Sequence, residues 1–183
     1  MRIFGWASRA AALGLAAAAC AGPATSKVVD AQANGFQVDV TADIAAPPEK
    51  VWAALVRPRD WWPLEHTWSH DPKNLSLDPR LGGCLCETLP PGGNMRHLQV
   101  IWVQPGQQLV LEGGMGPMLF SGTLTRLIWK LAPAPGGHTT LSWQFFGGGY
   151  WPGGYQALAP VVDSVATGQV QRLKAYVETG KPS

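Results

Sequence analysis

Apolar and polar residues alternate along much of the chain after residue 35. The clearest stretch is 36–45, FQVDVTADIA, in which Phe36, Val38 and Val40 occupy every second position. A period of two places these side chains on one face of a strand, so the pattern predicts a half-buried strand. Further strands are predicted around Leu75 and Leu77 and at 84–89, 96–104, 107–112, 119–131 and 139–146.

Two segments have helical spacing instead. The first begins at Pro47-Pro48-Glu49 and ends before Pro58, and both proline at the start and an early glutamate suit a helix N-terminus. The second covers about 156–177 and is followed by Gly180 and Pro182, which are typical helix stops. The positions of this second helix that we expect to face the sheet are Leu158, Val162, Val165 and Leu173.

The order of these elements predicts the fold class. A strand, a helix, five or six strands and a long terminal helix follow one another, and short turns join the strands. Such an order favours an α+β domain with one antiparallel sheet and helices on one face of it. The composition agrees, because 46% of the 183 residues are apolar and only 14% are charged, which excludes an acidic or basic disordered polymer. Nine tryptophans require a core, a cavity or an interface to cover them.

The first 26 residues have the three-part layout of a secretory signal peptide. Arg2 and Arg9 flank a start without acids, an Ala-rich apolar run follows, and small polar residues end the segment. Small residues suit cleavage after Ala21, or alternatively after Ser26. Cys20 follows four alanines and could instead be the lipidated cysteine of a bacterial lipoprotein. We therefore expect a periplasmic or secreted protein, with membrane attachment only through a lipid anchor at Cys20.

Removal of this segment leaves twelve basic and twelve acidic residues, so the net charge of the mature chain is about zero. No basic stripe remains to neutralise phosphates, and nucleic acid is a poor candidate partner. The expected organisation is a signal peptide at 1–26, a short linker at 27–35, one domain at 36–178 and a tail at 179–183.

Several segments together resemble a known superfamily. They are AAPPEKVWAAL at 45–55, DWWP at 60–63, LDPRLGGCLCE at 77–87 and GPMLFSGTLTRLIWKLAP at 116–133. The chain resembles the START-like superfamily, also called SRPBCC or polyketide cyclase-like, over almost the whole of 36–178. The resemblance implies a helix-grip fold, in which a curved antiparallel sheet of six or seven strands wraps around the long C-terminal helix. A hydrophobic cavity between sheet and helix is expected with it.

The resemblance implies more than one function. The leading hypothesis is binding or transport of a small hydrophobic or amphipathic molecule, such as a lipid, in the cavity. An enzyme of the cyclase or hydrolase type, with Glu87 and a nearby base, is an alternative. A protein-interaction module of the chaperone-activator type is a third. We expect no cofactor and no metal. The candidate ligand-binding residues are Trp62, Trp68, Leu85, Glu87, Trp102, Trp129, Trp143, Tyr150, Leu158 and Val162.

Glu87 is the candidate polar residue of this site. Leu85 and Glu87 share one face of a strand, and the resemblance implies that the position of Leu85 points inward. A basic residue across the hairpin, Arg96 or His97, could pair with Glu87, and a His–Glu pair could transfer protons. A pair on the surface is the alternative. Parity with Leu98 would turn His97 outward unless a bulge intervenes.

Cys84 and Cys86 also share a face of this strand. Strand neighbours two apart are too distant for a relaxed disulfide, so free structural thiols are the favoured interpretation. A strained disulfide or a metal site with His97 are the alternatives. His66 and His70 lie either in a solvated loop or at the mouth of a cavity. No complete catalytic motif is present in the sequence.

Overall fold

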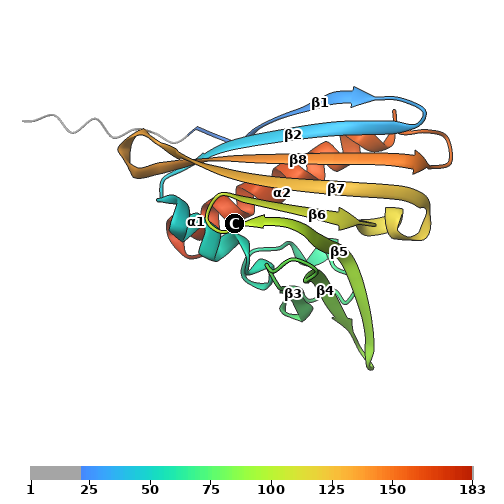
Figure 1. The fold of residues 1–183 in the computed structure, drawn as a ribbon, viewed down its shortest axis with the longest axis horizontal. Helices are drawn as coiled ribbons and strands as arrows, with labels where there is room; N and C mark the ends of the chain where they lie inside the picture. The colour runs from blue at the N-terminus through green and yellow to red at the C-terminus, as the bar shows by residue number, and fades with distance from the viewer. Residues whose placement is uncertain (1–21, 183) are drawn as a thin grey trace, which may run out of the picture.

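A single curved sheet and one long helix dominate the computed structural model, which describes residues 22–182 (Figure 1). All strand pairs are antiparallel, and the strand order is β1-β2-β8-β7-β6-β5-β4-β3. The strands are β1 (Thr25–Ala31), β2 (Gly35–Ile44), β3 (Leu75–Leu77), β4 (Cys84–Leu89), β5 (Gly93–Gln104), β6 (Gln108–Gly113), β7 (Gly122–Ala134) and β8 (His138–Tyr150). The helices are α1 (Pro48–Leu55) and α2 (Leu158–Thr179), and five short 3-10 turns include η2 (Leu64–His66) and η4 (Gly116–Phe120).

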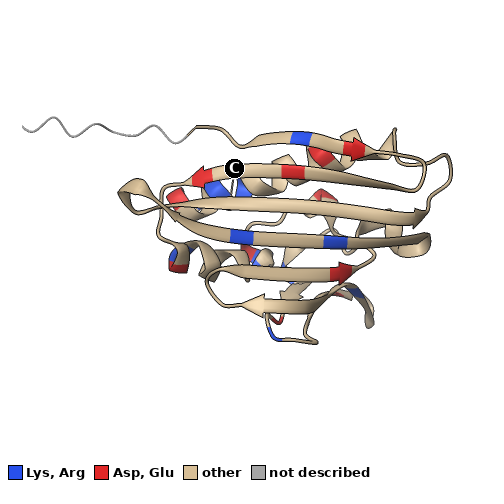
Figure 2. Cartoon of the chain, turned by 45° about the horizontal axis from the view of Figure 1, so that its top comes forward, with Lys and Arg blue, Asp and Glu red and all other residues tan. Residues whose placement is uncertain are grey.

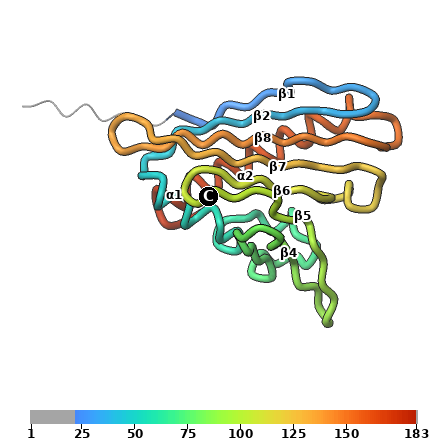
Figure 3. Tube along the Cα trace, viewed as in Figure 1, coloured from blue at the N-terminus to red at the C-terminus, as the bar shows by residue number. Residues whose placement is uncertain are grey.

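The sheet curves around α2, as the ribbon and the chain trace both show (Figures 1 and 3). Helix α2 packs mainly against β2, β1 and α1. The α+β helix-grip fold predicted from the sequence is therefore confirmed, although the sheet has eight strands and not six or seven. Within residues 22–182, no helix is long and apolar enough to cross a membrane.

The extra strand is β1, which occupies most of the segment predicted as a linker at 27–35. Its residues pair with β2 from Thr25 opposite Thr41 to Ala31 opposite Phe36. The prediction of a linker was wrong because β1 is an edge strand that buries no side chain fully, so its sequence carries no apolar alternation. Cys20 and most of the predicted signal peptide lie outside the described residues.

Aromatic side chains fill the centre of the core. Trp129 on β7 lies opposite Trp143 on β8, with ring centroids 4.8 Å apart. Trp61 and Trp62, in the loop after α1, pack onto Trp143 at centroid distances of 6.2 and 6.5 Å. The Trp61 indole also donates a hydrogen bond of 2.9 Å to the carbonyl of Ala54. Four of the nine tryptophans thus form one cluster that joins the sheet to the α1 region.

The face that α2 turns to the sheet differs from the predicted one. Leu173 is buried as expected, but Leu158, Val162 and Val165 are only half-buried. The residues of α2 that are buried are Ala159, Ala166, Gln169, Val170, Leu173 and Val177. In the first half of α2, Ala159 and Ala166 are buried, whereas Leu158, Val162 and Val165 border the cavity described below.

Charged residues are sparse on this fold and are not separated by sign. Lys, Arg, Asp and Glu are scattered along the strands and helices (Figure 2). On the outer face of the sheet, Arg126 of β7 pairs with Glu112 of β6. In this view blue and red residues are interspersed along the chain.

Candidate functional site

The first half of α2 forms one wall of a cavity of about 410 Å³. The sheet contributes Phe145 and His97 to the opposite wall, and the turn η4 and the loop 62–70 close the sides. The lining residues are Trp62, Glu65, His66, Thr67, Trp68, His70, His97, Met115, Gly116, Pro117, Met118, Phe145, Leu158, Val161, Val162, Val165, Ala166 and Gln169. Most of them are apolar, and the size lies within the range of small-molecule sites, about 300–1,000 Å³.

The loop 62–70 is held in place by its own hydrogen bonds. The Trp62 indole donates to the carbonyl of His66 at 3.1 Å, and the Thr67 hydroxyl donates to the carbonyl of Leu64 at 2.7 Å. Trp68 projects from this loop and meets Phe120 of η4 edge to face, with centroids 5.5 Å apart. Both rings are largely exposed, at 44% and 75%. Two exposed apolar rings therefore meet beside the cavity, one from each of the segments that line its sides.

Glu87 and His97 form a buried pair behind this loop. His97 Nε2 lies 2.8 Å from Glu87 Oε2, and the two side chains are 4% and 0% exposed. The pair depends on a β-bulge, because Leu85 pairs with Leu98 and Cys86 pairs with Arg96, which leaves His97 as an extra residue on β5. His97 and Leu98 are consequently both buried. Parity alone predicted that His97 points outward, and the bulge reverses this. The sequence prediction of the residue opposite Glu87 was also wrong, because that residue is Met95.

Glu87 accepts hydrogen bonds on both carboxylate oxygens. The backbone N–H of Ser69 donates to Oε1 at 2.6 Å, and the backbone N–H of Trp68 donates to Oε2 at 3.2 Å. Burial raises the pKa of Glu87, and the hydrogen bonds from Ser69, His97 and Trp68 lower it. The hydrogen bonds together have the larger effect, so the pKa of Glu87 lies below its ordinary value. Glu87 is therefore an ionised carboxylate that fixes both the loop and His97.

His97 is neutral in this arrangement. Burial lowers its pKa, and the hydrogen bond and charge of Glu87 offset only part of that effect. A neutral imidazole beside a carboxylate carries its proton on the nitrogen that faces the carboxylate, which is Nε2. The other nitrogen, Nδ1, is buried and has no hydrogen-bond partner within residues 22–182. His97, which lines the cavity, thus has a buried hydrogen-bond acceptor without a partner.

Four of the ten predicted site residues line the cavity: Trp62, Trp68, Leu158 and Val162. Leu85 is fully buried in the core beside the cavity, and so are Trp129 and Trp143. These three positions are structural, since their side chains are covered by neighbouring side chains and not by the cavity. Trp143 still contributes indirectly, because it supports Trp62 from behind.

Trp102 and Tyr150 lie outside the site, with exposed fractions of 56% and 72%. Tyr150 is the last residue of β8, where the sheet ends. Trp102 follows a second bulge, because Val100 pairs with Leu111 while Trp102 pairs with Val110, so Ile101 is the extra residue. One inserted residue reverses the face of each later side chain, and this turns Trp102 away from Leu98 and Val100.

Glu87 was expected to line the cavity, and the structure places it behind the wall. Its inward orientation and its parity with Leu85 are as predicted, but its oxygens are occupied by His97 and the loop. His97 lines the cavity in its place. Sequence reasoning also missed Phe145, Gln169 and the segment 115–118 as lining residues. Gln169 lies seven residues after Val162 on α2, and this helical spacing could have identified it.

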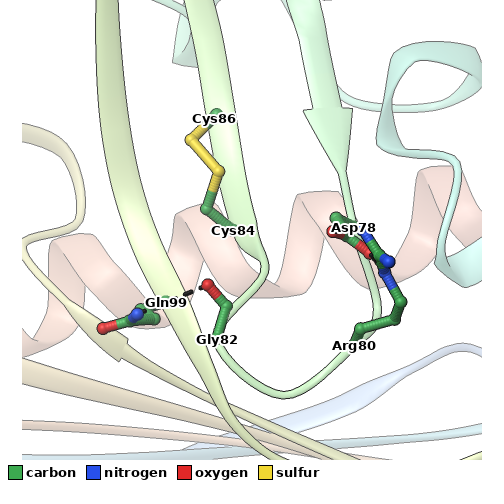
Figure 4. The surroundings of a disulfide bond; sticks show 6 residues. All are labelled: Asp78, Arg80, Gly82, Cys84, Cys86 and Gln99. Atoms are coloured by element: carbon green, nitrogen blue, oxygen red, sulfur yellow. Dashed lines mark hydrogen bonds and ion pairs between the residues drawn. A yellow bond between two sulfur atoms is a disulfide. The ribbon is translucent and has the colours of Figure 1, made fainter.

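Cys84 and Cys86 form a disulfide on the outer face of β4 (Figure 4). The prediction of free thiols was wrong because the strand is contracted here. The two Cα atoms are 5.4 Å apart, within the disulfide range of about 4.4–6.8 Å and shorter than the ~6.6 Å rise of two strand residues. The bridge occupies both sulfur atoms, so they are not thiolate ligands for a metal with His97. Across residues 22–182, no three His, Cys, Asp or Glu side chains gather as a metal site.

A family profile matches residues 35–178, which is most of the chain. The chain belongs to the polyketide cyclase/dehydrase and lipid transport family. This confirms the START-like resemblance found in the sequence. The comparison with curated proteins gave no match.

Solved structures agree on the fold. A conserved protein of unknown function from Enterococcus faecalis matches with a TM-score of 0.60 and 13% identity over 87% of this chain and 80% of that one. DynU16, from the dynemicin biosynthetic locus, matches with a TM-score of 0.56 and 24% identity over 80% of this chain and 48% of that one. CalU16 from Micromonospora echinospora has a TM-score of 0.55 and 13% identity over 85% and 88% of the two chains. At these identities the likeness concerns the fold alone.

Proposed function

We propose that the protein binds or carries a small apolar or amphipathic molecule between the sheet and α2. The observation that supports this proposal most is the 410 Å³ cavity itself, with apolar walls and few polar groups. Burial of apolar ligand surface against such walls supplies about 25 cal/mol per Å² before the costs of association. The description of the family covers lipid transport as well as cyclases and dehydrases, so a carrier role fits within it.

Export belongs to the same proposal. Cleavage after Ala21 leaves β1 intact, whereas cleavage after Ser26 removes the first two residues of that strand. We therefore favour cleavage after Ala21, with lipidation of Cys20 as the alternative form. The disulfide suits an oxidising compartment. Mass spectrometry of the protein from its own host would show a mature chain that begins at Gly22, or a lipid-sized increment on Cys20. A chain that retains Met1 would contradict export.

Binding can be tested with the fluorescent probe N-phenyl-1-naphthylamine, whose emission increases in apolar surroundings. The wild type should bind it with a Kd in the micromolar range. Val162→Trp fills the cavity from α2 and should weaken binding at least about tenfold. Val29→Trp adds the same ring on β1, away from the cavity, and should leave the Kd unchanged. Absence of binding to the wild type, or equal binding by both variants, would contradict the proposal.

Proton transfer on the bound molecule is a second candidate function, favoured by the buried Glu87–His97 pair. A neutral imidazole held by a carboxylate is suited to act as a general base. With 2-tetralone in D₂O, His97 would accept an α-proton as the C–H electrons form the enolate, and a deuteron would return to carbon. Wild type should accelerate this exchange, measured by proton NMR, and His97→Gln should not. Equal rates in both proteins would exclude this function for ketones.

A further inference from the structure

Two buried polar side chains that line the cavity carry polar groups without a hydrogen-bond partner among residues 22–182. His97 on β5 is 4% exposed and Gln169 on α2 is 6% exposed. Both line the cavity, and they come from opposite walls. Within the described part of the chain, neither His97 Nδ1 nor the amide of Gln169 takes part in a hydrogen bond. A buried polar group without a partner is costly, so a molecule that enters the cavity gains by pairing with both.

Glu87 determines which kind of partner His97 accepts. The carboxylate receives the backbone N–H groups of Trp68 and Ser69, and its remaining short contact is with His97 Nε2. Since an ionised carboxylate only accepts, the proton of that contact belongs to Nε2. Nδ1 is then a bare acceptor, and its partner in the cavity must donate a hydrogen bond.

The charges around the cavity exclude an anionic partner. Among the described residues that line it there is no Lys or Arg. Glu65 lies at the rim, and the ionised Glu87 lies directly behind His97. The remaining titratable groups at the cavity, His66 and His70, are exposed at its mouth and do not share the buried end. A carboxylate or phosphate at the buried end would therefore face an acceptor and a nearby negative charge, without a cation to pair with.

We infer that the ligand carries an uncharged hydroxyl at its buried end, as an apolar alcohol or phenol does. The hydroxyl donates to His97 Nδ1 and can accept from the amide of Gln169, because a hydroxyl does both. His97 and Gln169 are then the residues that determine specificity. Glu87 is a positioning residue that fixes the tautomer of His97. This inference rests on the proposed function, since it names the chemical class of the molecule in the cavity.

Three naphthalene probes of similar size test which polar group the buried end of the cavity prefers. They are 2-naphthol, which donates, 2-methoxynaphthalene, which only accepts, and 2-naphthoate, which is anionic at about pH 7. Each is measured by displacement of N-phenyl-1-naphthylamine. Wild type should bind 2-naphthol about tenfold tighter than 2-methoxynaphthalene, as one buried hydrogen bond implies, and 2-naphthoate most weakly. Similar affinities for the first two, or a preference for 2-naphthoate, would overturn the inference.

Matched variants assign the preference to residues. His97→Phe keeps a ring of similar size without the acceptor and should bind the first two probes equally. Gln169→Met should reduce the preference partly. The control is His138→Phe, which removes a histidine paired with Asp43 at 2.8 Å outside the cavity and should retain the full preference. A His97→Phe variant that keeps the preference would overturn the inference.

The tautomer can be read directly in the folded wild-type chain, even where a variant fails to fold. In ¹⁵N-histidine NMR, one imidazole should show a protonated Nε2 and a bare Nδ1, and 2-naphthol should shift that Nδ1 resonance. A protonated Nδ1 on the buried histidine would contradict the assignment. If 2-methoxynaphthalene binds as well as 2-naphthol, the inference fails and the proposed function stands. If no apolar probe binds, the proposed function fails first.

Discussion

The two halves of α2 differ in their surroundings, because the first half borders the cavity and the second half is packed in the core. In the second half, Val170, Leu173 and Val177 are buried. Polar contacts fasten this half as well, since Arg172 Nε donates to the carbonyl of Trp61 at 3.0 Å and Lys174 Nζ to that of Asp43 at 2.6 Å. The first half buries Ala159 and Ala166 and receives a hydrogen bond of 3.3 Å from Ser26 of β1 at Asp163, but its Leu158, Val162 and Val165 line the cavity.

This difference separates stability from binding within one element. The fastened half can keep α2 on the sheet, so the other half can border a cavity without loss of the fold. Side chains of the first half, such as Val162, already face open space, and a smaller residue there creates little new void. In the second half the side chains of Val170, Leu173 and Val177 are buried, so a smaller residue at one of these positions leaves a cavity.

The comparison predicts its largest effect for Leu173→Ala. This change should lower the free energy of unfolding by about 3 kcal/mol, in the range measured for buried leucines. Val162→Ala, in the first half, should lower it by about 1 kcal/mol or less, because its side chain is only half-buried. Urea unfolding followed by tryptophan fluorescence measures both. Equal losses would show that the two halves support the sheet alike.

Glu87→Gln should have the next largest effect. The variant keeps the shape of the side chain, but replaces a carboxylate that accepts from Ser69, Trp68 and His97. Loss of charge-assisted bonds should cost about 2 kcal/mol in unfolding free energy. The control is Glu112→Gln, at a partly exposed ion pair with Arg126, which should cost less than about 1 kcal/mol. A Glu87 variant as stable as its control would mean that the loop does not depend on this carboxylate.

The elements with regular periods were predictable from the sequence. Alternation in 36–45 and 139–146 gave β2 and β8, because a strand buried on one face must alternate. Spacing and stop residues gave α2, and the parity of Leu85 with Glu87 gave the inward orientation of the carboxylate. Each of these predictions needs only neighbours along the chain.

The remaining features depend on neighbours in space. The bulges at His97 and Ile101 arise from pairing with β4 and β6, and each changes which side chains point inward. They turned His97 into the cavity wall and Trp102 out of it, against their parity. The position of Val162 at a cavity likewise depends on which segments lie beside α2, which the helical period does not specify. The candidate site was therefore predicted less completely than the fold.

Acid should destabilise the protein through His97. Its pKa in the folded state is lowered by burial, so below about pH 6.5 the unfolded chain binds a proton that the folded chain resists. Stability is therefore fully present above that pH and falls as pH decreases, by at most about 1.4 kcal/mol per pH unit for one proton. Between about pH 7 and pH 5, wild type should lose about 1 kcal/mol more than His97→Phe. The other histidines are common to both proteins, so equal losses would contradict a buried neutral His97.

The smallest effect is expected for removal of the disulfide by the double change Cys84→Ser and Cys86→Ser. The bridge closes a loop of three residues, because its cysteines are two apart in the sequence. Such a short loop constrains the unfolded chain little, so we expect a loss of about 1 kcal/mol in unfolding free energy. Both sulfurs lie on the face of β4 opposite to Leu85 and Glu87, so binding of N-phenyl-1-naphthylamine should not change. The measurements are urea unfolding and probe titration of wild type and variant without reductant. A large loss of binding would show that the bridge fixes the bulge at His97, and would extend the site to the outer face of β4.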